Sequence, residues 1–93
     1  MKNRLLVRNL PESATPQALR ELFAGLGYEI QEIDFGPNER WRLPPGYAVV
    51  VLSRDADPQL AINDTDGKDF EGRALLVEGV KPLKWRYRSE RAA

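Results

Sequence analysis

The chain has 93 residues, of which 42% are hydrophobic and 30% charged, and its 14 basic and 14 acidic residues cancel to a formal net charge of zero. This length suits one small globular domain. The sequence contains no cysteine and no histidine, which excludes disulfides, thiolate or imidazole metal sites and Ser–His or Cys–His catalytic pairs. No apolar run approaches the roughly 20 residues of a membrane-spanning helix, and the N-terminus lacks the apolar core of a signal peptide. The composition therefore favours an intracellular binding module, with no cofactor, metal or membrane, over an enzyme.

The first half of the chain predicts a strand, a helix and a second strand. Residues 4–8 have the composition of a β-strand. Alternation divides its side chains between two faces, with Leu5 and Val7 on one and Arg4, Leu6 and Arg8 on the other. Thr15 and Pro16 supply an N-cap and a first-turn proline, so a helix begins there, and Gly27 ends it. Residues 28–35 place isoleucine and phenylalanine among acidic residues and predict the second strand.

The second half predicts a loop, a strand, a helix and a final strand. Residues 36–46 form a loop that contains three prolines. Residues 47–52, with three consecutive valines, carry the strongest strand signal. The Asp-Pro pair at residues 57–58 begins a short helix, which residues 63–67 turn back. Residues 74–78 predict the last strand.

This order predicts an α+β fold, a ferredoxin-like βαββαβ sandwich. Two right-handed strand–helix–strand units form a four-stranded antiparallel sheet. Both helices lie on one face, because each has only one apolar stripe to bury. The domain is expected over residues 1–82, followed by a basic, aromatic C-terminal tail over residues 83–93. The other face of the sheet stays open, and its residues decide the function.

Three segments resemble the RNA recognition motif family. The hexamer LLVRNL (residues 5–10) is similar to the family's motif on the first strand, and PGYAVVVL (residues 45–52) to its octamer on the third. The run from Gly67 to Leu75 is similar to the family's G-K-x-F-x-G-R-x-L approach to the last strand. The likeness covers roughly residues 3–82, in the order that the fold requires. It implies an RRM-type sandwich that stacks the bases of single-stranded RNA on rings of the open face.

The sequence departs from the family pattern on that face. Tyr47 matches one ring position, but Leu6 and Val49 stand at the other two, and Pro45 replaces a basic residue that meets phosphate. Stacking contributes about 1–3 kcal/mol per base, so the loss of two rings weakens binding by several kcal/mol. Thr65 stands where an apolar residue is expected near the end of the second helix, which predicts a looser fit there.

Two basic and aromatic segments are predicted to compensate. One is the Arg40-Trp41-Arg42 run in the loop, and the other is the C-terminal region, where residues 81–93 hold five basic residues and one acid. Cations for phosphates and rings for bases are typical of single-strand binding. The acidic residues gather elsewhere, at residues 29–34 and 55–71, so the zero net charge hides a polarised surface. The predicted RNA-binding residues are Arg4, Leu6, Arg8, Arg40, Trp41, Arg42, Tyr47, Val49, Val51, Lys84, Trp85, Arg86 and Tyr87.

Leu6, Val49 and Val51 would also form an apolar patch on the open face, and such patches usually have an occupant. Either the tail covers the patch, with Trp85 or Tyr87 folded onto the sheet, or an external partner binds it. The alternative function is therefore a protein-binding domain of the same fold, with little or no RNA binding. Single-stranded DNA is an alternative nucleic acid, a monomer is expected beside the alternative of a dimer, and both a bacterial cytoplasm and a eukaryotic nucleus or cytoplasm fit. Trp41 is either a base platform or an anchor for its loop.

Two sharper motifs fail. The Asp-Thr-Asp-Gly run at residues 64–67 suggests a calcium loop, but Ile62 and Arg73 occupy positions that need ligands. Acylphosphatases share the chain order, but no glycine-rich phosphate loop follows the first strand. An enzyme is therefore not predicted.

Overall fold

A computed structural model describes residues 3–80 of the chain. The predicted tail residues Lys84, Trp85, Arg86 and Tyr87 lie outside this range. The elements are β1 (Arg4–Arg8), α1 (Pro16–Gly25), β2 (Ile30–Phe35), β3 (Ala48–Leu52), α2 (Pro58–Thr65), β4 (Asp69–Phe70), β5 (Arg73–Ala74) and β6 (Leu76–Gly79). The main sheet has the strand order β2-β3-β1-β6 and its pairs are all antiparallel. The predicted ferredoxin-like sandwich is confirmed.

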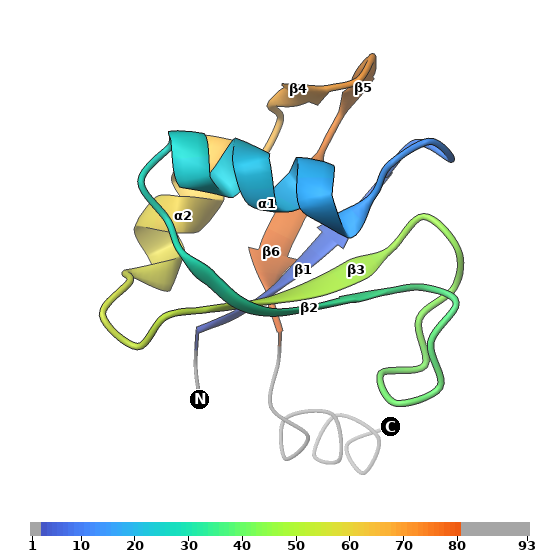
Figure 1. Cartoon of the computed structure of the whole chain (residues 1–93), viewed down its shortest axis with the longest axis horizontal. Coiled ribbons are helices and arrows are strands. Elements are labelled where there is room, and N and C mark those ends of the chain that lie inside the picture. The colour runs from blue at the N-terminus through green and yellow to red at the C-terminus, as the bar shows by residue number, and fades with distance from the viewer. Residues whose placement is uncertain (1–2, 81–93) are drawn as a thin grey trace, which may run out of the picture.

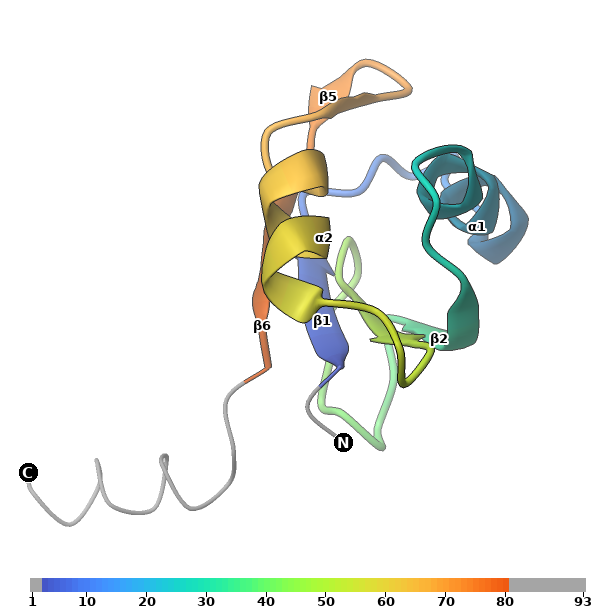
Figure 2. The same cartoon turned by 90° about the vertical axis from the view of Figure 1, so that its left-hand side faces the viewer.

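Both helices cover one face of this sheet, while the loop between β2 and β3 hangs on the other side (Figures 1 and 2). Each helix begins where the sequence predicts, because a cap satisfies its first amides. The Thr15 hydroxyl accepts a hydrogen bond from the amide of Ala18, and the Asp57 carboxylate accepts from the amides of Gln59 and Leu60. The Tyr28 hydroxyl donates to Asp64 on α2, and this hydrogen bond raises the pKa of the tyrosine.

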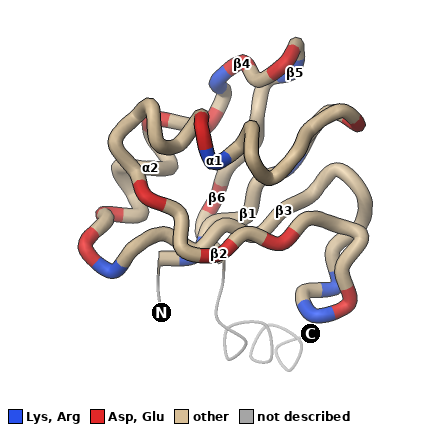
Figure 3. Tube along the Cα trace, viewed as in Figure 1, with Lys and Arg blue, Asp and Glu red and all other residues tan. Residues whose placement is uncertain are grey.

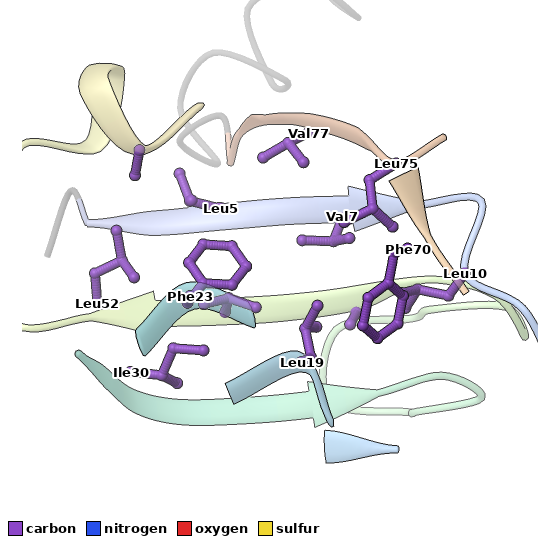
Figure 4. Close-up of a cluster of buried hydrophobic side chains, with 13 residues drawn as sticks. Leu5, Val7, Leu10, Leu19, Phe23, Ile30, Leu52, Phe70, Leu75 and Val77 are labelled. Atoms are coloured by element: carbon purple, nitrogen blue, oxygen red, sulfur yellow. The ribbon is translucent and has the colours of Figure 1, made fainter. Parts of the chain in front are cut away.

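The hydrophobic core lies between the helices and the sheet (Figure 4). Alternate strand residues point into it, as predicted for Leu5 and Val7 on β1. On β3 the core residues are Ala48, Val50 and Leu52, and Phe23 of α1 is fully buried against this cluster. The remaining side chains of β1 and β3 therefore belong to the face without helices.

Two elements differ from the sequence prediction. Residues 63–65 were expected to turn but form the last turn of α2, because Thr65 is fully buried and its hydroxyl donates to the Ala61 carbonyl at 2.7 Å. The predicted looser fit at Thr65 is therefore wrong. The short hairpin of β4 and β5 was not predicted. Glu71 and Gly72 connect its strands and both have positive φ, as a two-residue hairpin loop requires.

Candidate nucleic-acid interface

The helix-free face is built from cross-strand rows of side chains. Residues that pair across neighbouring strands point to the same face of a sheet. One row contains Asp34, Val49, Leu6 and Glu78, in the order of the strands, and the next contains Glu32, Val51 and Arg4. The sequence predicted this face for Arg4 and Leu6, and the register confirms it.

The loop between β2 and β3 is itself a small hairpin. Asn38 and Leu43 exchange two backbone hydrogen bonds, of 3.0 and 2.8 Å, and thus close a tip of residues 39–42. The Asn38 side chain also accepts a hydrogen bond from the amide of Trp41 at 3.2 Å. Leu43 is only 8% exposed, so it anchors the base of the hairpin. The tip is therefore held in one conformation by backbone bonds and an apolar anchor.

This hairpin carries Trp41 to the sheet. The indole N–H donates to the Asp34 carboxylate at 2.7 Å. The guanidinium of Arg4 lies over the same ring, 5.4 Å from its centroid, and that of Arg40 lies 5.1 Å from it. Since Asp34 lies on β2 and Arg4 on β1, the tryptophan reaches across β3, which separates these strands. Arg4, Arg40 and Trp41 thus meet, as the prediction of a shared surface requires.

Val49 is not available on this surface. Its side chain points away from the helices, yet only 2% of the residue is exposed. The position of Trp41 across β3 explains this burial. The prediction of an exposed patch of Leu6, Val49 and Val51 is therefore wrong for Val49, while the other two are half-buried. The loop supplies the cover that the sequence analysis sought in the tail or in a partner.

A second row lies toward the other end of β1. Tyr47 directly precedes β3, and continuation of the register sets it opposite Arg8, which pairs with Leu76. Tyr47 is half-buried, and Leu76 is 43% exposed. Arg8 lies 3.6 Å from the Glu78 carboxylate, and its buried Nε atom has no hydrogen-bond acceptor among the described residues. This row presents a ring, a weakly held cation and an apolar side chain.

The acidic residues do not keep to other surfaces, as the sequence analysis predicted. Glu32, Asp34 and Glu78 share the helix-free face with Arg4 and Arg8, and Figure 3 shows acidic positions along β2 as well as charges of both signs at the loop tip. The alternation of β2 carried the missing signal, because Ile33 and Phe35 pack against the core and so turn Asp34 outward.

Arg42 and Asn9 remain from the sequence analysis. Arg42 is exposed at the loop tip with a φ of 57°. Asn9 also has a positive φ, and its side-chain amide donates to the Ala74 carbonyl at 2.8 Å. Asn9 therefore orders the chain after β1, as predicted.

Two searches of residues 3–80 returned nothing. Over this range no helix has the length and apolarity needed to cross a membrane. No three histidine, cysteine, aspartate or glutamate side chains in the same range are grouped to hold a metal ion.

Comparisons with known proteins agree with this geometry. The sequence profile of the RNA recognition motif matches residues 5–76, so the chain belongs to this family. It is similar to the putative RNA-binding protein RbpD of Nostoc sp., with 32% identity over 78 residues that span 84% of this chain and 82% of that protein. The probable RNA-binding protein 19 of Homo sapiens is 32% identical over 74 residues, which cover 80% of this chain and only 8% of the human protein. Among solved structures, the Sxl-lethal protein/RNA complex superposes with a TM-score of 0.71 and 27% identity, over 88% of this chain and 48% of that one.

Proposed function

We propose that this domain binds short single-stranded RNA as a monomer, through the helix-free sheet face, the β2–β3 loop and the basic tail of residues 83–93. One observation carries the proposal. The loop sets Trp41 and Arg40 on the same face as Arg4, next to the row of Tyr47 and Arg8. Rings and cations thus alternate over one surface, which single-strand binding requires. Membership of the RNA recognition motif family supports the same ligand, and RNA as a ligand agrees with work inside the cell.

The residues divide the work by their chemistry. Tyr47 stacks one base, and Arg8 turns from Glu78 to a phosphate. This exchange costs little, because an exposed ion pair contributes only about 0–1 kcal/mol. Arg4, Arg40 and Arg42 meet further phosphates. The remaining contacts are an apolar floor and a clamp, made by Leu6 and Val51 and by Lys84, Trp85, Arg86 and Tyr87.

Residue-resolved NMR with a degenerate single-stranded RNA octamer tests this proposal. At low salt we expect shifts at Arg8, Tyr47 and residues 40–42. With about three to four phosphates contacted, the logarithm of affinity falls against the logarithm of salt with a slope of about −2 to −3. Tyr47→Ala weakens binding by about 5- to 100-fold, the equivalent of one stacked base.

Arg54→Ala is the matched control, because this exposed arginine lies in the loop between β3 and α2, beyond the proposed surface. It is expected to leave the affinity unchanged within about twofold. An absence of shifts on the sheet, or an affinity that does not depend on salt, would refute RNA binding on this face and favour a protein partner instead. A DNA octamer of the same length tests the alternative nucleic acid.

A further inference from the structure

A carboxylate lies in the middle of a surface that is proposed to bind a polyanion. Asp34 accepts the indole N–H of Trp41 at 2.7 Å and lies 3.6 Å from the Arg40 guanidinium, with 28% of its side chain exposed. Like charges repel, so on electrostatic grounds alone an aspartate here weakens the binding of phosphates. Its contacts indicate a different contribution.

We propose that Asp34 is a positioning residue, which holds the Trp41 ring on the sheet as a base-stacking platform. The ring then replaces one of the two aromatic positions that Leu6 and Val49 occupy in this chain. This inference rests on the proposed function and adds a residue that the sequence analysis assigned to the acidic side of the molecule.

The location of the ring supports this substitution. Trp41 extends from Asp34 on β2 to Arg4 on β1 and so crosses β3, where Val49 is buried to 98% although no helix covers that face. Val49 is one of the positions at which the family resemblance implies an aromatic ring. An indole above this valine thus presents its ring near the place where that aromatic side chain would lie.

The ring is ordered before a ligand arrives. The hairpin of residues 38–43 fixes its backbone, and the Asp34 bond fixes the rotation of its side chain. Ordering a binding group in advance removes an entropic cost from association. Arg4 and Arg40 lie over the ring in cation–π contacts, which at exposed sites are weaker than a stacked base. A base can therefore displace them, and they become free for phosphates.

The sign of one mutational effect separates this role from simple repulsion. Asp34→Ala removes both a negative charge and the anchor of the ring, and we expect it to weaken binding of the RNA octamer by about 3- to 10-fold. Glu32→Ala is the matched control, since Glu32 is the neighbouring acid of β2 on the same face and has no side-chain hydrogen bond or ion pair among residues 3–80. Its removal is expected to tighten binding by up to about threefold.

Two further variants complete the test. Asp34→Asn retains an oxygen that accepts the indole N–H, so it restores wild-type affinity or exceeds it. Trp41→Ala weakens binding by about 5- to 100-fold, as expected for a lost stacking platform. The backbone amide spectrum of each variant confirms that the fold is retained.

The indole N–H signal of Trp41, assigned with Trp41→Phe, reports the ring itself. In the wild type it is expected to shift on RNA addition, and in free Asp34→Ala it moves toward the position of a solvent-exposed indole. Tighter binding by Asp34→Ala or by Trp41→Ala would overturn the inference, because the ring would then block the face. If the wild type binds the octamer with Tyr47 and Arg8 while Trp41→Ala binds equally well, only this inference fails. If the wild type does not bind, the proposed function fails as well.

Discussion

Thr65 occupies a fully buried position at the end of α2 although its side chain carries a hydroxyl. That hydroxyl donates to the Ala61 carbonyl, so the polar group is satisfied, and the γ-methyl group is left to pack in the core. We therefore expect Thr65→Val to keep the free energy of unfolding within about 1 kcal/mol of wild type. Thr65→Ser keeps the hydroxyl but loses the methyl group, and it lowers stability by about 1 kcal/mol. Urea unfolding of both variants tests this ranking, and a larger loss in the valine variant would contradict it.

The site residues differ in how far the sequence determines them. Strand alternation alone places Arg4 and Leu6 on the helix-free face, because a period of two leaves no other choice once the core face is known. The contact of Trp41 with Asp34 joins a loop to a strand, and no period of the sequence encodes it. The burial of Val49 follows from the same contact, so it escaped prediction for the same reason.

Among the elements, the β2–β3 loop depends on the glycine at its start. A Cβ atom on Gly36 would lie 2.0 Å from the Pro44 carbonyl oxygen and 2.8 Å from its carbon, both backbone atoms. Gly36→Ala thus forces the two arms of the loop apart, and we expect a loss of about 1–3 kcal/mol in the free energy of unfolding. The indole N–H signal of Trp41 would shift with the loop, and the affinity for RNA would fall.

Gly25→Ala is the matched control for this substitution, since a Cβ atom there has nothing within 4 Å. Gly25 is the last residue of α1, where alanine is favoured over glycine by up to about 1 kcal/mol. We expect unchanged or slightly higher stability and an unshifted Trp41 signal. Equal stability of the Gly36 and Gly25 variants in chemical denaturation would show that the close approach at Gly36 does not constrain the loop.

The elements themselves were predictable where a local cap or a uniform strand composition specifies them. Thr15 and Asp57 cap the two helices, and the valine run forms β3, as their sequences indicate. The end of α2 was not predictable, because residues 63–65 are polar and favour a turn, and only tertiary burial of Thr65 keeps them helical. The β4–β5 hairpin escaped because two-residue strands leave no periodic signal.

Over the whole molecule, the zero net charge is divided between the domain and its C-terminal tail. Residues 1–82 contain 10 basic and 13 acidic residues, a net charge of 10 − 13 = −3, and residues 83–93 contain 4 basic residues and 1 acid, a net charge of 4 − 1 = +3. The folded part alone is therefore acidic, and acidic side chains lie on its helix-free face. Its long-range field disfavours a polyanion, so the attraction needed for association must come from the tail.

A chain that ends at Pro82 tests this division. We expect its affinity for the RNA octamer to fall by at least about tenfold at low salt, and its salt slope to move toward zero by about 2, because about three phosphate contacts are lost. The amide spectrum of residues 3–80 shows whether the domain remains folded. A full-length variant with Trp85 and Tyr87 changed to alanine is the control, since it loses rings but no charge. It binds more weakly with an unchanged salt slope. Equal affinity of the shortened and full chains would mean that Arg4, Arg8 and Arg40 overcome the acidic field unaided.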